Sequence, residues 1–292
     1  MIIAAIPAFN EEGSIARIVI GARKYVDQVI VVDDGSTDNT GTIAKTHGAM
    51  VIRHPENQGY GAAIRTIFEK AKELQADQLV ILDADGQHDP EEIPTLLSAL
   101  DNDADAVIGS RFLGDGHNLI PTYRKLGMKS LDFATNIAGN IDISDSQSGF
   151  RAYGRSAINS VKPDKLGMSG GSAILIQMAD QHMRIREVPV TVRYDLENTS
   201  SANPVLHGCS VLASLIGMIL HRRPFIFIGL PGGIMALSGF FLALPSFITM
   251  NSTFFVPDNP SLVAILLITG GLLLVIASVM LGSDIRMRRP RD

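Results

Sequence analysis

The hydrophobic positions of the first 200 residues follow the pattern of an α/β protein. Short apolar runs are typical of buried strands, and they occur at Ile2–Ile6, Val29–Val32, Met50–Ile52, Leu79–Leu82, Ala106–Ile108 and Val188–Val192. Helical patterns lie between the early runs, over Ser14–Tyr25, Asn39–His47 and Gly61–Leu74. Strands that alternate with helices predict an α/β fold with a mostly parallel sheet and crossover helices.

The last third of the chain has a different pattern. Phe225–Thr249 and Ser261–Gly282 are apolar runs without a charged residue, and each exceeds the ~20 residues needed to cross a hydrocarbon core. Basic residues precede the first run at 221–223 and follow the second at 286–291. By the positive-inside rule, they predict a multi-pass membrane protein with both termini in the cytoplasm. A buried helical hairpin of a soluble protein is the alternative, and the long absence of charge disfavours it.

These patterns predict four parts. We expect an α/β domain over 1–200, a juxtamembrane segment over 201–223, two transmembrane helices over 224–283 and a basic cytoplasmic tail over 284–292. Apolar residues recur at helical spacing in Val205–Leu220, which favours either an interfacial helix on the membrane or a helix packed on the core.

Composition narrows the function classes. The 292-residue chain is 46% hydrophobic and carries a net charge of −5, so nucleic-acid binding is not expected. The lone cysteine, Cys209, excludes an internal disulfide and is compatible with a reducing compartment.

The chemistry concentrates where the predicted strands end. Asp83 and Asp85 directly follow Leu79–Leu82, and side chains two apart in an extended segment share a face. Open α/β sheets bind ligands at the carboxyl ends of their strands. Two carboxylates this close need a cation or donor groups to offset their repulsion. A divalent ion held jointly with a substrate phosphate would supply that charge.

Two other strand ends carry polar residues. The first strand leads into Pro7–Glu12, and the second leads into Val31–Asp38. An acidic residue after an early strand can accept hydrogen bonds from a ribose. The first strand is not followed by Gly-x-Gly-x-x-Gly, which argues against a dinucleotide-binding fold.

Taken in order, these motifs resemble the family 2 glycosyltransferases, which have the GT-A fold. The resemblance covers about the first 195 residues, and its motifs are Pro7–Glu12, Val31–Asp38, Asn57–Gly59, Asp83–Pro90, Gly109–Arg111 and Asp145–Arg151. With the two apolar runs, the chain is similar to the polyprenyl-phosphate branch, which includes dolichyl-phosphate mannose and glucose synthases.

The resemblance implies roles for individual residues on the donor side. The nucleotide pocket would be lined by Pro7, Phe9 and Glu11, with Asp33 or Asp34 on the base or ribose, Asp83 on the nucleoside and Arg193 on the phosphates. Asp85 and Gln87 would hold Mg²⁺ or Mn²⁺, since both ions favour oxygen ligands. For Arg193, an ion pair at the surface is the alternative.

The implied acceptor is a polyprenyl phosphate. A phosphomonoester with a second pKa of about 6 is largely ionised at neutral pH, so it needs alignment more than a strong base. The candidates to bind it are Arg111, Arg124, Lys125 and Ser130, while Gln147 and Arg151 would touch donor or phosphate. Asp85, Arg111, Arg124 and Gln147 are thus the expected catalytic set, and single displacement would invert the anomeric carbon.

Some features keep alternatives open. Ala173 stands where relatives commonly carry an acid, which would suit a catalytically silent membrane scaffold that binds nucleotide sugars. A processive polysaccharide synthase is disfavoured because the chain lacks tryptophan and therefore the Gln-x-x-Arg-Trp motif. A UDP-sugar donor is slightly favoured over GDP-mannose. Gly232-Gly233 and Gly270-Gly271 give the spans small faces for helix packing, which makes a homo-oligomer conceivable.

Overall fold

The computed structural model divides the chain into two compact units, Met1–Leu215 and Ile216–Asp292, which we describe separately. It describes residues 1–101, 103–114, 122–162, 170–192, 224–248 and 259–288, together with 213, 217 and 220. Most of the predicted juxtamembrane segment, 201–223, and the tail residues 289–292 lie outside the described residues. The predicted domain boundaries therefore stay predictions.

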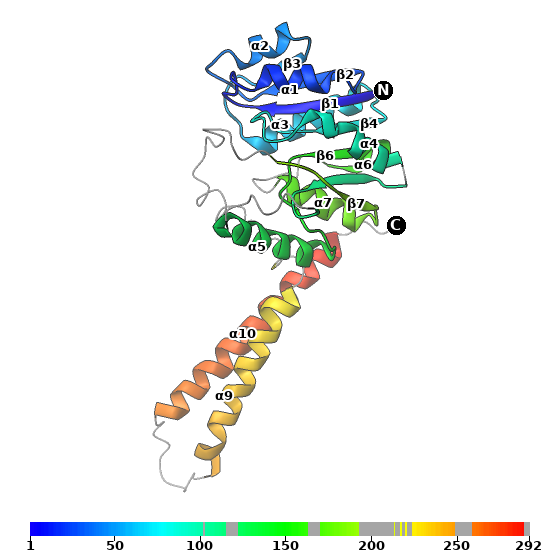
Figure 1. Cartoon of the computed structure of the whole chain (residues 1–292). Coiled ribbons are helices and arrows are strands. Elements are labelled where there is room, and N and C mark those ends of the chain that lie inside the picture. Colours follow the sequence, from blue (N-terminus) through cyan, green and yellow to red (C-terminus); the bar gives the residue numbers. More distant parts are fainter. Residues whose placement is uncertain are drawn as a thin grey trace. The chain divides into compact units, whose positions relative to one another are not determined.

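The described residues of the first unit form a seven-stranded sheet with the order β3-β2-β1-β4-β6-β5-β7 (Figure 1). Its strands are β1 (Ile2–Ala8), β2 (Gln28–Asp33), β3 (Met50–Arg53), β4 (Gln78–Ile81), β5 (Ala106–Ser110), β6 (Arg151–Gly154) and β7 (Ile185–Pro189). All neighbouring strands are parallel except for the two pairs that contain β6. The prediction of an α/β fold with a mostly parallel sheet is confirmed.

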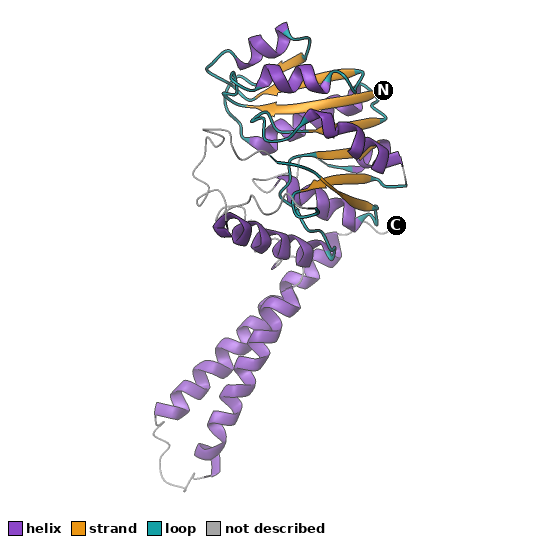
Figure 2. Ribbon diagram, viewed as in Figure 1, coloured by secondary structure: helices purple, strands orange, loops and turns teal. Residues whose placement is uncertain are grey.

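Helices cover both faces of this sheet (Figure 2). They are α1 (Ile15–Ala22), α2 (Thr40–Thr46), α3 (Tyr60–Glu73), the 3₁₀ helix η1 (Pro90–Glu92), α4 (Ile93–Asp101), α5 (Thr122–Gly139), α6 (Arg155–Ser160) and α7 (Gly170–Asp180). On one face, Ile18 of α1 and Leu96 of α4 pack with Ile6 in a continuous buried core. On the other, Phe68 of α3 meets Tyr153 of β6 edge to face, with ring centres 5.1 Å apart.

Two strands differ from the prediction. The sequence analysis missed β6 because its four residues include Arg151 and Gly154 and form no apolar run. The last strand begins at Ile185, three residues before the predicted Val188–Val192. Among the described strands β7 pairs only with β5, so it can carry charged residues that no hydrophobic pattern reveals.

The strand directions gather the chemistry-bearing loops at one edge. Because β1, β2, β4 and β5 are parallel, their carboxyl ends lie at the same edge of the sheet. β6 runs in the opposite direction, so the residues before Arg151 arrive at that edge as well. This is where open α/β sheets bind their ligands.

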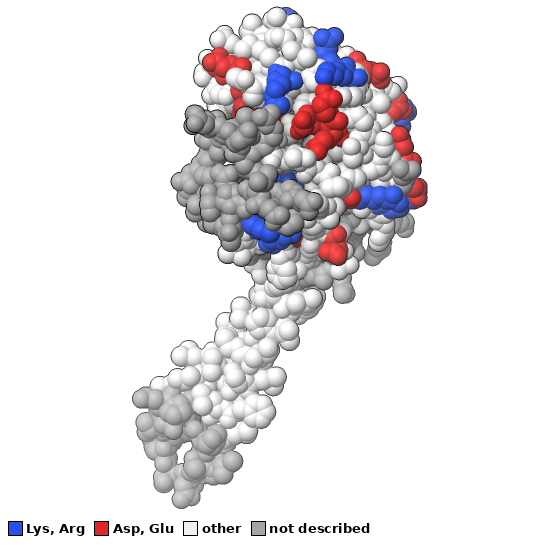
Figure 3. Space-filling view, in the orientation of Figure 1, with Lys and Arg blue, Asp and Glu red and all other residues white. Residues whose placement is uncertain are grey.

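The second unit is a helical hairpin. A π-helical turn, η4 (Phe225–Gly229), leads into α9 (Leu230–Ile248), which packs along α10 (Asn259–Arg288). Two segments, Phe225–Leu244 and Leu262–Ser283, are long and apolar enough to cross a membrane, with mean hydropathies of 2.0 and 2.8. Their described atoms show no Lys, Arg, Asp or Glu in Figure 3.

Glycines allow the backbones of α9 and α10 to approach closely. A Cβ atom on Gly271 would lie 2.5 Å from the backbone N of Ala236 and the carbonyl O of Gly232, which no real Cβ tolerates. Gly239 faces the Ala264 carbonyl O in the same way, at 2.8 Å. Small residues at such crossings let helices pack without a hydrophobic driving force.

We expect Gly271→Ala to loosen the hairpin by about 1–3 kcal/mol, because the added methyl group overlaps backbone that cannot rotate away. Gly233→Ala is the matched control, since nothing lies within 4 Å of a Cβ at that position. Thermal unfolding of the full chain in detergent, followed by circular dichroism, should give a lower midpoint for Gly271→Ala only. Equal midpoints would contradict the tight crossing.

Candidate functional site

The loop after β4 leaves several polar side chains partly accessible. Burial alternates along the loop: Asp83, Asp85 and Gln87 are half-buried, while Ala84 and His88 between and beside them are buried. The Asp85 Oδ1 atom accepts the backbone N–H of Gln87 at 2.9 Å and closes a tight turn. The two carboxylates and the amide are thus each partly accessible.

Acidic groups crowd this edge of the sheet. Burial raises the pKa of Asp83 to about 7, and the neighbouring Asp85 carboxylate adds to the rise. Burial likewise raises the pKa values of Asp85 and of Glu11, which follows β1. The Arg111 guanidinium acts in the opposite direction on both Asp83 and Asp85. A bound cation would relieve the remaining repulsion.

The oxygen donors of this loop fit a divalent metal ion. The Asp85 carboxylate and the Gln87 amide are hard oxygen ligands of the kind that Mg²⁺ and Mn²⁺ prefer, and Mg²⁺ usually completes its shell with water and substrate phosphates. Within the described ranges no three His, Cys, Asp or Glu side chains gather as a metal-ligand cluster.

Gly149 brings a second motif against the acidic loop. A Cβ atom at this position would overlap the Asp83 carboxylate. Only a glycine therefore lets the segment before β6 lie directly on Asp83, and this contact joins the 145–151 motif to the 83–90 motif.

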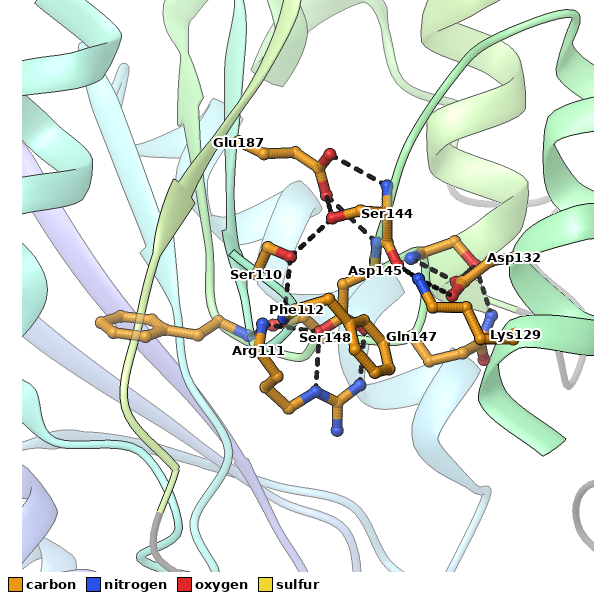
Figure 4. Close-up of polar contacts among 12 residues, drawn as sticks. Ser110, Arg111, Phe112, Lys129, Asp132, Ser144, Asp145, Gln147, Ser148 and Glu187 are labelled. Atoms are coloured by element: carbon orange, nitrogen blue, oxygen red, sulfur yellow. Dashed lines mark hydrogen bonds and ion pairs between the residues drawn. The ribbon is translucent and has the colours of Figure 1, made fainter. Parts of the chain in front are cut away.

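Arg111, the first residue after β5, is held by Asp145. Its Nε and Nη2 atoms donate to the two carboxylate oxygens at 2.7 Å each, and its backbone N–H donates to Oδ2 at 3.0 Å (Figure 4). The Asp145 side chain is fully buried. Burial acts to raise the pKa of Asp145, but the hydrogen bonds and charge of Arg111 hold it below its ordinary value. This two-point pair fixes the plane of the guanidinium.

The helix α5 contributes further cationic and hydroxyl groups. Lys129 donates to the Ser144 carbonyl O at 3.0 Å, and its Nζ lies 3.9 Å from the centre of the Phe112 ring. Ser130 is exposed and donates to the Leu126 carbonyl O. Lys125 lies on the same helix. The side chain of Arg124 and all of Arg193 lie outside the described residues.

Within the 145–151 motif, the two predicted ligand contacts have different surroundings. Gln147 is half-buried and donates to the hydroxyls of Ser146 and Ser172, both at 2.9 Å. Arg151 is buried, and its guanidinium donates to the carbonyl oxygens of residues 146, 148 and 171. Because these hydrogen bonds tie the Arg151 guanidinium to the backbone, the structure gives no support to its expected contact with donor or phosphate. Ala173 is buried on α7 and presents no carboxylate.

The predicted nucleotide residues lie at the ends of β1 and β2. Pro7 is buried within β1, whereas Phe9 beyond its end is half-buried, as is Glu11. Asp33 is buried and accepts the Ser36 N–H at 2.9 Å.

Asp34 is also buried, and it organises the loop after β3. Its carboxylate accepts the N–H groups of Gln58 and Gly59 at 3.0 and 2.8 Å and lies 2.6 Å from Nδ1 of His54. Its direct role is therefore to shape this loop.

Two acids of the site escaped the sequence analysis. Asp132 of α5 is buried, and its Oδ1 accepts the N–H and the hydroxyl of Ser146 at 2.7 Å each. Glu187 of β7 accepts from Ser144 and Asp145. Neither belongs to a recognisable motif, so only a structure could reveal them.

The burial of Asp132 predicts that the stability of the folded chain depends on pH. Burial raises its pKa to about 6, against hydrogen bonds from Ser146, and its Oδ2 lacks a hydrogen-bond partner among the described residues. An acid whose folded pKa is raised contributes stability below about pH 4 and loses it as the pH rises through 6. The loss amounts to at most about 3 kcal/mol.

Asp132→Asn should remove this loss, so the variant should gain stability over the wild type between pH 4 and pH 7 in urea unfolding followed by circular dichroism. A constant difference would contradict the assignment.

The sequence is similar to those of known proteins. The family model described as Glycosyl transferase family 2 matches residues 3–161. A UDP-N-acetylglucosamine–dolichyl-phosphate N-acetylglucosaminyltransferase of Methanococcus voltae is 32% identical over 72% of this chain and 93% of its own length. An undecaprenyl-phosphate mannosyltransferase of Micrococcus luteus is 33% identical over 65% of this chain and 82% of its own length.

Solved structures share the fold. The glucosyl-3-phosphoglycerate synthase of Mycobacterium tuberculosis, in complex with Mn²⁺, uridine diphosphate and phosphoglyceric acid, superposes with a TM-score of 0.58. The match is 22% identical and covers 76% of this chain and 78% of that one. At this identity the likeness supports the GT-A-like fold alone.

Proposed function

This chain belongs to glycosyl transferase family 2, and on that premise we propose that it transfers a sugar from a nucleotide sugar to a polyprenyl phosphate, with inversion of the anomeric carbon. It is a glycosyltransferase by family. The observation that carries the proposal is the pairing, at one sheet edge, of the acidic loop 83–87 with the fixed guanidinium of Arg111.

The acidic loop suits the donor. Asp85 and Gln87 would hold Mg²⁺ or Mn²⁺, which would stabilise the negative charge that develops on the leaving nucleoside diphosphate. Asp83 and Glu11 line the same edge, and with Phe9 they would contact the nucleoside. Relatives named for UDP-N-acetylglucosamine and for mannose transfer leave the donor open, and we favour a UDP-sugar.

The basic group suits the acceptor. A lipid phosphate is already ionised near neutral pH, so the nucleophilic oxygen needs orientation rather than deprotonation. A guanidinium whose plane is fixed by Asp145 can provide that orientation without reorganising. Lys125 and Ser130 on α5, together with Arg124, would extend this anion-binding surface, and Gln147 would contact the reacting groups.

The hairpin suits a lipid acceptor. Two segments of sufficient length and apolarity would anchor the enzyme in a membrane as a multi-pass protein, with the catalytic unit and both termini in the cytoplasm. An anchored enzyme meets its lipid substrate in two dimensions, so even a modest intrinsic affinity suffices.

The defining experiment is transfer of radiolabelled sugar into organic-extractable lipid. The full chain in detergent is incubated with Mg²⁺, polyprenyl phosphate and, in turn, UDP-glucose, UDP-N-acetylglucosamine and GDP-mannose. We expect one donor to label the lipid and EDTA to abolish the label. Nucleotide binding without any labelling would instead identify a silent scaffold, and label in a water-soluble polymer would identify a processive synthase.

Asp85→Asn should lower kcat about 10²–10³-fold, because it weakens the site that would hold the metal ion, whose positive charge would stabilise the leaving group. Asp89→Asn is the matched control: Asp89 lies two residues beyond Gln87, and its carboxylate caps η1 by accepting the Glu91 N–H. That variant should keep its turnover. Equal turnover of both variants would remove Asp85 from the site.

Arg111→Lys should raise KM for the lipid phosphate about 10-fold and leave nucleotide affinity unchanged, because an ammonium group cannot form the two-point pair with Asp145. Arg155→Lys is the control, since Arg155 is an exposed residue paired with Asp77. Steady-state kinetics with the lipid varied, and nucleotide titration by calorimetry, separate the two effects. A KM within twofold of the wild-type value would remove Arg111 from acceptor binding.

A further inference from the structure

We propose that Glu187 is a positioning residue for the acceptor phosphate, acting through the 144–145 turn and Asp145 to hold Arg111 in place. The inference rests on the proposed function, because it assigns Arg111 to the acceptor. Glu187 lies in the edge strand β7, opposite Ile108 of β5 in the parallel register. It belongs to none of the motifs that the sequence analysis identified.

Three donors converge on the Glu187 carboxylate (Figure 4). The Ser144 N–H donates to Oε2 at 2.9 Å, while the Ser144 hydroxyl and the Asp145 N–H donate to Oε1 at 2.9 and 3.1 Å. Two successive backbone N–H groups and a hydroxyl are thus directed at one anion. This arrangement fixes the turn from the side opposite to the ion pair.

The same turn carries the ion pair. The backbone N–H of Asp145 donates a hydrogen bond to Glu187, and the Asp145 carboxylate accepts three hydrogen bonds from Arg111. The turn is therefore held on one side by the Glu187 carboxylate, to which it donates, and on the other by the Arg111 guanidinium, which it binds. A shift of the turn would move the guanidinium with it, and displacements near 1 Å can cost about 10²-fold in rate.

Glu187 also sets the direction of the hydroxyl chain at the end of β5. A serine hydroxyl has one proton. Because Ser144 gives its proton to Glu187, the 2.7 Å contact between Ser110 and Ser144 requires Ser110 to donate. The Ser110 oxygen is then an acceptor for the Phe112 N–H at 3.3 Å. The carboxylate thus sets the orientation of the Ser110 hydroxyl, next to Arg111.

Glu187→Gln tests the proposal with minimal change of shape. An amide has one oxygen, so its NH₂ group must face either the Ser144 N–H or the Ser144 hydroxyl with the Asp145 N–H. At least one backbone donor loses its acceptor. We expect kcat/KM for polyprenyl phosphate to fall 3- to 10-fold, mainly through KM and by no more than for Arg111→Lys, with the nucleotide dissociation constant unchanged within twofold.

Glu92→Gln is the matched control. Glu92 is also half-buried, and both of its carboxylate oxygens accept a backbone N–H, that of Thr191, at 3.0 and 3.2 Å. It has no hydrogen bond to the 144–145 turn in the described structure. We expect Glu92→Gln to keep the wild-type KM for the lipid.

A double-mutant cycle separates positioning from general support of the fold. In the Arg111→Lys background, Glu187→Gln should change KM for the lipid less than twofold, because the group that it positions is already gone. An undiminished, additive effect would overturn the proposal. If Glu187→Gln does not fold, Ser144→Ala, which removes only the hydroxyl, should give a smaller rise in the same KM, and no rise would overturn it.

The outcomes distinguish this proposal from the one on which it rests. Wild-type enzyme that labels no lipid with any donor would overturn the proposed function. Wild-type enzyme that labels lipid, with Glu187→Gln and Glu92→Gln indistinguishable in KM, would overturn the role of Glu187 alone.

Discussion

The buried ion pair between Arg111 and Asp145 is the interaction on which the rest of the site depends. Asp145 is fully buried, and a bare carboxylate there would be costly without a matched, hydrogen-bonded partner. The pair supplies that partner and joins the end of β5 to the segment before β6. The same segment reaches Asp83 through Gly149. One charge pair therefore sets how the basic and acidic halves of the site face each other.

The proposed reaction explains why the site needs both halves. A nucleotide sugar and a lipid phosphate are both anions, and they must meet at bonding distance. Raised pKa values at Asp83, Asp85 and Glu11 mark a cluster of acids from two loops that favours a bound cation, which suits the diphosphate. Arg111 offers a fixed cation on the other side, which suits the acceptor. Separate counter-charges let two anions approach without relying on one shared group.

Much of the fold was predictable because hydrophobic burial leaves a periodic trace. Buried parallel strands such as β1 and β2 are continuous apolar runs, so the sequence predicts them directly. Strand β6 escaped prediction because it is short and begins with a buried arginine whose donors are satisfied by backbone carbonyls. Strand β7 was predicted three residues too late in the sequence, because it lies at the sheet edge in the described structure, where charged residues are tolerated.

For the site, the sequence by itself determined the local chemistry: Asp83, Asp85 and Gln87 follow a buried strand, although residues 84–86 form a turn and not the extended segment that the sequence analysis expected. Only the tertiary structure decided which distant groups meet. Arg111 and Asp145 are 34 residues apart, and Glu187 lies 42 residues beyond Asp145. Pairing of β5 with β6 and β7 brings them together. Such contacts depend on the order of the strands in the sheet, which the local pattern of polar and apolar residues does not encode.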